Sequence, residues 1–153
     1  MILVDADACP VKREVASVAQ RRRVPVVMVA ATYLRLPEDP LIRLYVAGDG
    51  FDAADDAIAA VAGPGTVVLT ADVPLMARAL EAGARVLDFR GREMTGANIG
   101  NVVASRDLMH ELRGGIEGRE GRPSGPPPFG PADRSAFLNG LDRVLTAMGL
   151  GPP

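Results

Sequence analysis

A regular alternation of short apolar runs with amphipathic segments fills the first 87 residues and limits the possible folds of this chain more than any other feature. The runs are rich in Val, Ile and Leu without regular polar alternation, which is typical of strands buried on both faces of a parallel sheet. Five strands are predicted on this basis: Ile2 to Val4, Val24 to Ala30, Arg43 to Val46, Thr66 to Thr70 and Arg85 to Leu87.

The segments between these runs have the apolar spacing of amphipathic helices. We predict helices at Pro10 to Arg23, Asp52 to Ala62 and Pro74 to Ala82. Strands that alternate with helices form parallel sheets with right-handed crossovers and helices on both faces. The predicted class is therefore α/β, a three-layer sandwich around a central parallel five-stranded sheet.

The last third of the chain adds two predicted helices, at Asn98 to Arg113 and at Ala132 to Met148. Eleven of the eighteen residues from Gly114 to Pro131 are Gly or Pro, so we predict a loop there. With 153 residues, 48% of them apolar, the chain suits a single domain over 1–153. The helix at 132–148 would dock back onto that domain.

Charge and cysteine content exclude several classes of protein. The net charge of −2 gives no overall positive field, so tight sequence-independent binding to a phosphate backbone is not expected from charge alone, although local basic patches are compatible with it. A single Cys cannot form an internal disulfide, and no signal peptide or long apolar run is present. We expect a cytoplasmic protein without a membrane partner; the sequence does not indicate its oligomeric state.

Acidic residues follow three of the predicted strands. Asp5 and Asp7 end the first strand, Asp72 follows the fourth, and Asp52 and Asp55 open the helix after the third. The carboxyl ends of parallel strands meet at one edge of a sheet, which is where ligands of open α/β sheets bind. We therefore expect these acids to converge on that edge. Any one of them alone is better explained as a helix cap or turn residue, and it is the convergence of Asp5, Asp7 and Asp72 that favours a functional site.

Crowded carboxylates need neutralising. Two of them about 4 Å apart repel by roughly 4 kcal/mol at an effective dielectric constant of about 20, so either they bind protons or a cation lies among them. Carboxylates without His or Cys partners favour Mg²⁺ or Mn²⁺, which can orient a water and stabilise the charge on a phosphodiester. We predict Asp5, Asp7, Asp55 and Asp72 as catalytic and metal-binding residues, with Asp52 as a further metal ligand.

Four residues near the same edge are candidates for substrate binding: Thr70, Arg90, Lys12 and Asn98. Each also has a structural explanation, since Thr70 could close its strand, Asn98 could cap the next helix, and Arg90 and Lys12 could be solvated or ion-paired. Arg13 and Arg106 are further candidates for phosphate contacts. Cys9 is predicted to be a small packed residue, and His110 a surface or cap residue.

Several motifs together make the chain resemble the YaiI/YqxD family: VDADACPVK, YLRLP, GDGFDAADD, VLTADVPLMARALEAGARVLDFRG, NIGN and DRSAFLNGLDRVL. That family is in turn similar to PIN-like nucleases. The resemblance implies a central parallel sheet of order 3-2-1-4-5 and a Mg²⁺ or Mn²⁺ site formed by the acids named above. The resulting hypothesis is a metal-dependent nuclease that acts on RNA by phosphodiester hydrolysis.

Two other functions compete with this hypothesis. One is a non-catalytic metal- or nucleotide-binding regulatory module. The other is a phosphatase of the haloacid-dehalogenase type, in which Asp5 would attack phosphate and Asp7 would act as acid and base. Lys12 is the only lysine in the chain, so no later lysine is available to hold the phosphate of such an enzyme.

Overall fold

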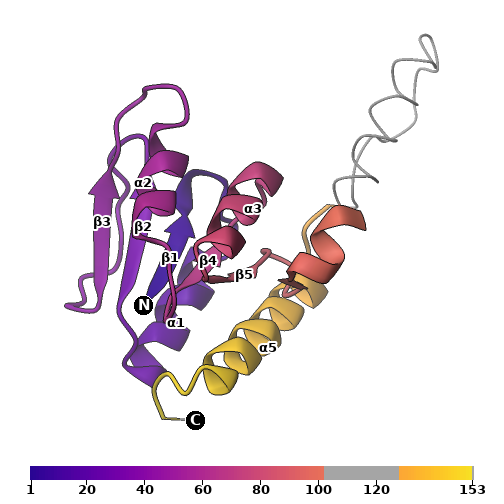
Figure 1. Cartoon of the computed structure of the whole chain (residues 1–153). Coiled ribbons are helices and arrows are strands. Elements are labelled where there is room, and N and C mark those ends of the chain that lie inside the picture. Colours follow the sequence, from indigo (N-terminus) through magenta and orange to yellow (C-terminus); the bar gives the residue numbers. More distant parts are fainter. Residues whose placement is uncertain (102–127, 153) are drawn as a thin grey trace, which may run out of the picture.

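A computed structural model describes residues 1–101 and 128–152 and shows a six-stranded sheet of order β3-β2-β1-β4-β5-β6 (Figure 1). The first five strands are parallel, which confirms the predicted order 3-2-1-4-5. The sixth strand pairs antiparallel with β5 and was not predicted. The bounds of the strands are β1 Ile2–Asp5, β2 Val26–Ala30, β3 Ile42–Val46, β4 Val67–Leu69, β5 Arg85–Leu87 and β6 Glu93–Met94.

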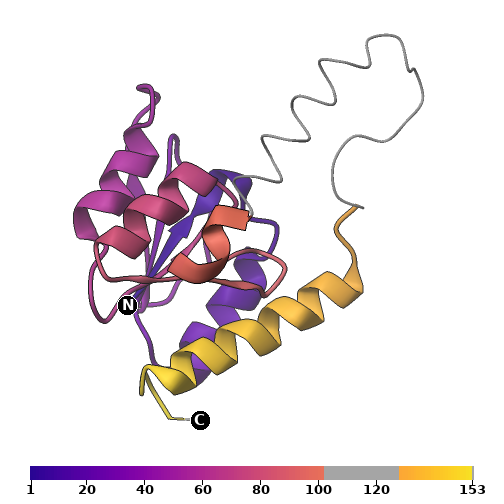
Figure 2. The ribbon, with the colours of Figure 1, turned by 45° about the vertical axis from the view of Figure 1, so that its right-hand side comes forward.

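The helices cover both faces of the sheet and confirm the three-layer arrangement. Their bounds are α1 Lys12–Arg22, α2 Ala53–Val61, α3 Val73–Glu81 and α5 Pro131–Ala147. Helices α2 and α3 pack together on one face, whereas α1 and α5 lie on the other (Figures 1 and 2). Strand β1 contributes to both cores, since Ile2 and Val4 pack toward α1 and α5 while Leu3 packs toward α2 and α3.

Helix α1 begins two residues later than the sequence predicted. Residues Ala6–Ala8 form a single 3-10 turn, η1, and Cys9 has an extended backbone, so the first α-helical hydrogen bond joins the N–H of Val15 to the carbonyl of Val11 (2.9 Å). This turn is the segment that carries Asp7. The carboxyl end of β1 is therefore followed by a short irregular link and not directly by a helix.

The short strand β6 exists because the chain reverses tightly after β5. The side chain of Asp88 accepts hydrogen bonds from the N–H groups of Arg90 and Arg92 (2.9 Å each), and Gly91 has a φ of 85°. Helix α5 crosses this turn so closely that a Cβ on Gly140 would collide with the backbone of Gly91. Glycine is thus required where the last helix contacts the end of the sheet.

Helix α5 is the helix expected at 132–148. Its residues Phe137, Leu141, Val144 and Leu145 are buried in the same core as α1. Residues 96–101 are helical, which agrees with the beginning of the helix predicted at 98–113. The rest of that segment, with Arg106 and His110, and most of the Gly/Pro-rich segment 114–131 lie outside the described residues.

Within residues 1–101 and 128–152, no helix combines the length and apolar character needed to cross a bilayer.

Candidate functional site

The carboxyl ends of β1 and β4 are joined by a hydrogen-bonded chain through Thr70. The Oγ1 of Thr70 donates to Asp5 Oδ2 (2.9 Å) and accepts from the backbone N–H of Asp72 (3.0 Å). Thr70 is fully buried, whereas Asp5 and Asp72 are partly exposed. The buried hydroxyl therefore fixes the two acidic residues relative to each other on neighbouring strands.

Asp72 also caps helix α3. Its Oδ1 accepts from the N–H of Leu75 (2.9 Å), as an N-cap side chain does. Helix capping, the structural explanation that the sequence suggested for these acids, therefore accounts for one oxygen of Asp72. Its Oδ2, like Oδ1 of Asp5, has no hydrogen-bond partner within the described part of the chain.

Asp55 brings a third carboxylate to this edge from the first turn of α2. The pKa of Asp55 is raised to about 6, first because the carboxyl is partly buried and then because Asp72, Asp5 and Asp52 repel its negative charge; Arg78 opposes the shift. Burial also raises the pKa of Asp5, and Asp72 and Asp7 add to this rise against the hydrogen bond from Thr70.

Each of these carboxylates thus destabilises the charged form of at least one other. We call Asp5, Asp55 and Asp72 the acidic cluster. They come from three separate segments of the chain, as the positions of the predicted strands implied.

Asp52 lies next to the acidic cluster but is exposed. Its backbone has a φ of 56°, in the left-handed region that Asp tolerates better than most residues, and its side chain makes no capping hydrogen bond to α2. Capping therefore does not explain this residue. Its neighbour Asp56 points elsewhere, since Oδ1 of Asp56 pairs with the Arg78 guanidinium at 2.8 Å.

Asp7 lies at the same edge of the sheet and has a structural hydrogen bond. It is exposed on the η1 turn, and its Oδ2 accepts a hydrogen bond from the N–H of Ala31 at the end of β2 (2.8 Å). Asp7 thus links β1 to β2 at this edge, and its charge still contributes to the raised pKa of Asp5. It lies at the side of the acidic cluster and is not part of the Asp5–Thr70–Asp72 chain.

The free carboxylate oxygens of the acidic cluster suit a small ion that is held by few protein ligands. Among residues 1–101 and 128–152, no group of three or more His, Cys, Asp or Glu side chains is arranged to hold a metal ion. Mg²⁺, however, keeps several waters and is commonly held by one or two carboxylates together with substrate phosphates. The unpaired oxygens of Asp5 and Asp72 fit that kind of site, whereas a cage made of five aspartates does not fit this geometry.

Two of the predicted substrate-binding residues already have protein partners. Nη1 of Arg90 pairs with Asp133 Oδ1 of α5 at 2.9 Å. Asn98 accepts from the N–H of Thr95 (2.7 Å) and donates to the carbonyl of Glu93 (3.1 Å), so it closes the turn at the start of the helical segment. These contacts supply the structural explanations that the sequence left open.

The other two candidates differ in accessibility. Thr70 is too deeply buried for a surface ligand to reach, and its hydrogen bonds favour a positioning role. Lys12 is partly buried, and its Nζ donates to the carbonyl of Cys9 (2.8 Å). Cys9 itself is packed in the core, and burial is the main cause that raises its thiol pKa to about 11.

Arg134 was missed by the sequence reasoning. It lies on α5, yet its Nη1 donates to the carbonyl of Pro10 (3.0 Å) and pairs with Glu14 Oε1 (3.1 Å), more than 100 residues away along the chain. No local pattern could have identified this contact, because it depends on how α5 docks beside α1.

Comparison with known proteins identifies relatives over nearly the whole chain. A family model described as "Uncharacterized BCR, YaiI/YqxD family" matches residues 3–147. A UPF0178 protein of Jannaschia sp. (strain CCS1) is 50% identical over 145 residues, covering 95% of this chain and 92% of that protein. Another, from Sphingopyxis alaskensis, is 49% identical over 151 residues, covering 99% of this chain and 96% of that protein.

No solved structure matches the chain, so the similarity to PIN-like nucleases stays a prediction. The family resemblance itself, which rested on motifs spread from VDADACPVK to DRSAFLNGLDRVL, is confirmed by the family model and by both relatives. The chain belongs to the YaiI/YqxD family.

Proposed function

We propose that this protein is a Mg²⁺- or Mn²⁺-dependent nuclease that hydrolyses phosphodiester bonds in RNA. The observation that carries the proposal is the acidic cluster, in which carboxylates from three segments repel one another and none is hydrogen-bonded to a Lys or Arg among the described residues. Such an arrangement is costly unless a ligand uses it, because the repulsion raises the free energy of the folded state.

The roles of the residues follow from their geometry. Asp5 and Asp72 would hold the ion through the oxygens that have no protein partner. When bound, the ion would neutralise the charge that develops on the phosphodiester and lower the pKa of a bound water. Thr70 is a positioning residue, because its hydroxyl fixes Asp5 relative to Asp72.

Asp55 is suited to proton transfer. Before the ion binds, the pKa of Asp55 is raised to about 6, mainly by burial, and burial continues to favour proton uptake when an ion neutralises Asp5 and Asp72. In this proposal Asp55 accepts the proton of the attacking water. Asp7 and Asp52 act through their charge at the border of the site. The relation to PIN-like nucleases and a cytoplasmic location are parts of the same proposal.

A non-catalytic metal- or nucleotide-binding module is the second candidate. It would hold its ligand through the same unpaired oxygens of Asp5 and Asp72 and needs no group for proton transfer. A phosphatase has less support, because Asp7, its acid-base residue, is bonded to Ala31 at the end of β2.

Cleavage of a fluorescently labelled single-stranded RNA with Mn²⁺ tests the proposal. We expect cleavage that EDTA abolishes and that falls at least about 100-fold in both Asp5→Asn and Asp55→Asn. Asp56→Asn is the matched control, since it makes the same change on the same helix next to Asp55 but outside the acidic cluster.

Absence of cleavage in the wild type, or equal cleavage in all four proteins, would overturn the nuclease assignment. If the wild type instead releases phosphate from a small phosphomonoester, the phosphatase is correct. If it binds Mn²⁺ or a nucleotide and does neither reaction, the binding module is correct.

A further inference from the structure

An open cavity of about 450 Å³ lies at the start of α1, where the beginning of α5 meets it. Six residues line it: Cys9, Pro10, Lys12, Arg13, Glu14 and Arg134. We call it the basic cavity, because three of these side chains are cationic and one is anionic.

Arg134 and Glu14 neutralise each other within the wall. They form an ion pair at 3.1 Å, and the guanidinium of Arg134 also donates to the carbonyl of Pro10 and lies 5.2 Å from the centre of the Phe129 ring. Arg134 is therefore held in place by contacts from three directions. The remaining excess of two positive charges belongs to Lys12 and Arg13.

Both of these cations have donors available for a ligand. The Nζ of Lys12 uses one of its three N–H donors on the carbonyl of Cys9 (2.8 Å), which anchors the ammonium and leaves two donors. Arg13 is exposed and makes no hydrogen bond or ion pair with any residue that the structure describes. A site with excess positive charge and several N–H donors fits a phosphate group.

The basic cavity lies close to the acidic cluster. Asp5 of the cluster is four residues before Cys9 in the cavity wall, so their Cα atoms are separated by no more than about 14 Å, and those of Asp7 and Cys9 by no more than about 7 Å. The charge of Asp5 also reaches the wall of the cavity, since it contributes to the raised pKa of the Cys9 thiol, after the larger effect of burial. A site for anions and a site for cations are thus neighbours on one edge of the protein.

We propose that the basic cavity binds a backbone phosphate of single-stranded RNA, one that neighbours the phosphodiester at the acidic cluster. This inference rests on the proposed function, because it requires the strand to continue from the cavity to the carboxylates. Contacts from Lys12 and Arg13 would set the position of the strand without reading its sequence, as phosphate contacts do. Arg134, which is neutralised by Glu14, would form the wall contributed by α5.

Fluorescence anisotropy of a labelled 12-nucleotide RNA, measured in EDTA at several salt concentrations, tests this without any cleavage. For single strands, each lost phosphate contact reduces the slope of log K against log salt concentration by about 0.7. We expect the Lys12→Gln and Arg13→Gln double variant to lose about 1.4 of the slope and to bind about tenfold more weakly at low salt.

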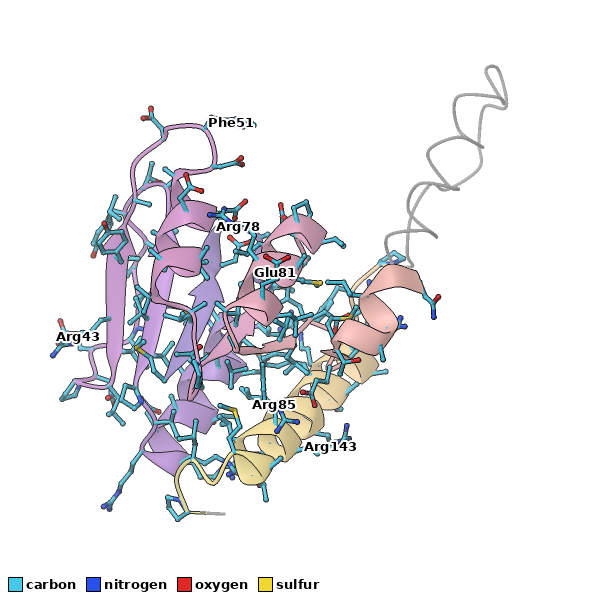
Figure 3. All side chains as sticks on the ribbon, in the orientation of Figure 1. Arg43, Phe51, Arg78, Glu81, Arg85 and Arg143 are labelled. Atoms are coloured by element: carbon cyan, nitrogen blue, oxygen red, sulfur yellow. The ribbon has the colours of Figure 1, made fainter. Side chains whose placement is uncertain are left out.

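Two further variants separate a binding effect from a folding effect. Arg13→Gln alone removes no protein contact within the described residues and should lose about 0.7 of the slope. The control is the Arg43→Gln and Arg143→Gln double variant, which removes the same number of positive charges as the cavity double variant. Arg43 lies on the edge strand β3 and Arg143 on α5, far from each other in Figure 3, and neither residue lines the basic cavity. The control should bind within twofold of the wild type.

Equal affinity and equal slope in the wild type and both cavity variants would overturn the inference, as would an equal loss in the control. Absence of RNA binding by the wild type would also overturn it. These outcomes are distinct from a failure of the proposed function. If the variants lose binding as expected but the wild type does not cleave RNA with Mn²⁺, the phosphate site stands and the nuclease does not.

Discussion

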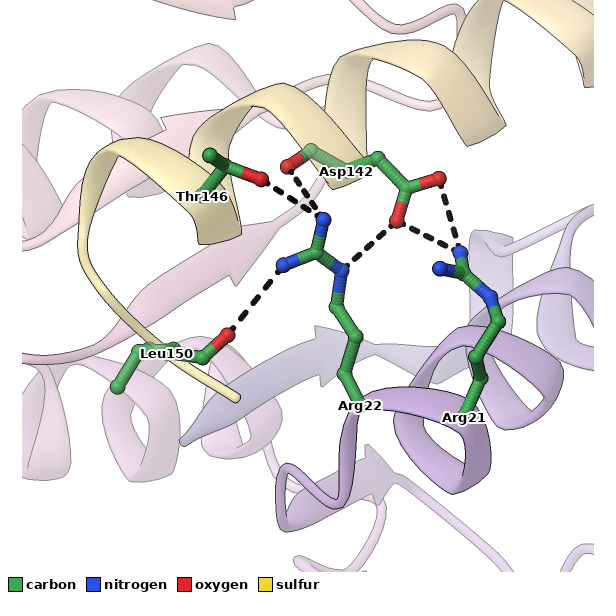
Figure 4. A network of polar contacts seen from close by, with 5 residues as sticks. All are labelled: Arg21, Arg22, Asp142, Thr146 and Leu150. Carbon is green, nitrogen blue, oxygen red and sulfur yellow. Dashed lines mark hydrogen bonds and ion pairs between the residues drawn. The ribbon is translucent and has the colours of Figure 1, made fainter. Parts of the chain in front are cut away.

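The two ends of the sheet carry polar clusters of opposite character. At the amino ends of the strands, Arg22 is buried, with an exposed fraction of 4%. Its guanidinium donates hydrogen bonds to three acceptors (Figure 4): Asp142 Oδ1 (2.9 Å), Thr146 Oγ1 (2.8 Å) and the carbonyl of Leu150 (3.4 Å). Arg21 pairs with the same Asp142. We call this the arginine clamp. At the carboxyl ends, the acidic cluster holds like charges, and no Lys or Arg in the described part of the chain is hydrogen-bonded to them.

The difference shows in how protons bind to the two clusters. Burial alone would raise the pKa of Asp142, but hydrogen bonds and charges from Arg21 and Arg22 outweigh it and hold the pKa below its ordinary value. The stability that Asp142 contributes is therefore complete above about pH 4 and is lost as the pH falls through that lowered pKa. The pKa of Asp55 is raised instead, so its contribution is lost as the pH rises.

Charges that satisfy one another indicate a structural role, and charges that do not indicate a ligand. The arginine clamp fastens the end of α1 to the end of α5, and its guanidinium groups find their acceptors inside the protein. In the acidic cluster, hydrogen bonds from Thr70 and Leu75 leave one oxygen each of Asp5 and Asp72 without a partner among the described residues. We infer that the first cluster maintains the fold and that the second exists for function.

The largest effect is expected from Arg22→Ala. It removes a buried cation that joins α1 to α5, leaves Asp142 with only Arg21, and should lower the free energy of unfolding by about 3 kcal/mol. Urea unfolding followed by circular dichroism measures this. A loss below about 1 kcal/mol would mean that the clamp does not hold the two helices together.

Thr70→Val should have the next largest effect. The change keeps the shape but removes the donor to Asp5 and the acceptor for the N–H of Asp72, which should cost about 2 kcal/mol. Thr70→Ser, which retains the hydroxyl, is the control in the same unfolding experiment and should retain most of the stability. If Thr70→Val and Thr70→Ser lower the free energy of unfolding equally, the hydroxyl does not connect the two acidic residues.

Asp55→Asn should stabilise the protein in the absence of divalent ions. In the wild type, stability should fall as the pH rises from about 4 to 6, because over this range the folded protein holds a proton on Asp55 that the unfolded chain releases. The variant should gain about 1 kcal/mol at pH 7 and nothing at pH 4, a small gain because solvent screens the partly exposed carboxyl. A variant that is less stable at pH 7 would contradict the repulsion.

The smallest effect is expected from Asp56→Asn. Its ion pair with Arg78 is exposed on both sides, and such pairs are worth less than about 1 kcal/mol. Thermal unfolding should show a change within about 2 °C. A larger loss would mean that Arg78 acts on the acidic cluster more strongly than its position on the surface suggests.

Sequence reasoning succeeded where a pattern repeats over several residues. The strands Ile2–Asp5 and Arg85–Leu87 follow from apolar runs, and Asp5 and Asp72 were expected at one edge because each follows such a run. The two-residue strand Glu93–Met94 was not found, because it is too short to show any periodicity. It forms only because the chain reverses tightly after β5.

Side-chain orientation was the part that the sequence could not provide. Asp7 bonds to Ala31 of β2, and Arg90 bonds to Asp133 of α5, so both depend on how distant segments dock. Thr70 was considered as a ligand contact, but its burial between neighbouring strands favours a positioning role.

Thermal unfolding with and without Mn²⁺ tests the central claim most directly. At a free Mn²⁺ concentration of about 100 times Kd, binding to the native state adds about 2.7 kcal/mol and should raise the Tm of a protein of this size by about 5–10 °C. Asp56→Asn should retain the shift, and the Asp5→Asn and Asp72→Asn double variant, in which Asn can still cap α3, should lose it. No shift in the wild type, or the same shift in the double variant, would contradict a divalent ion at the acidic cluster.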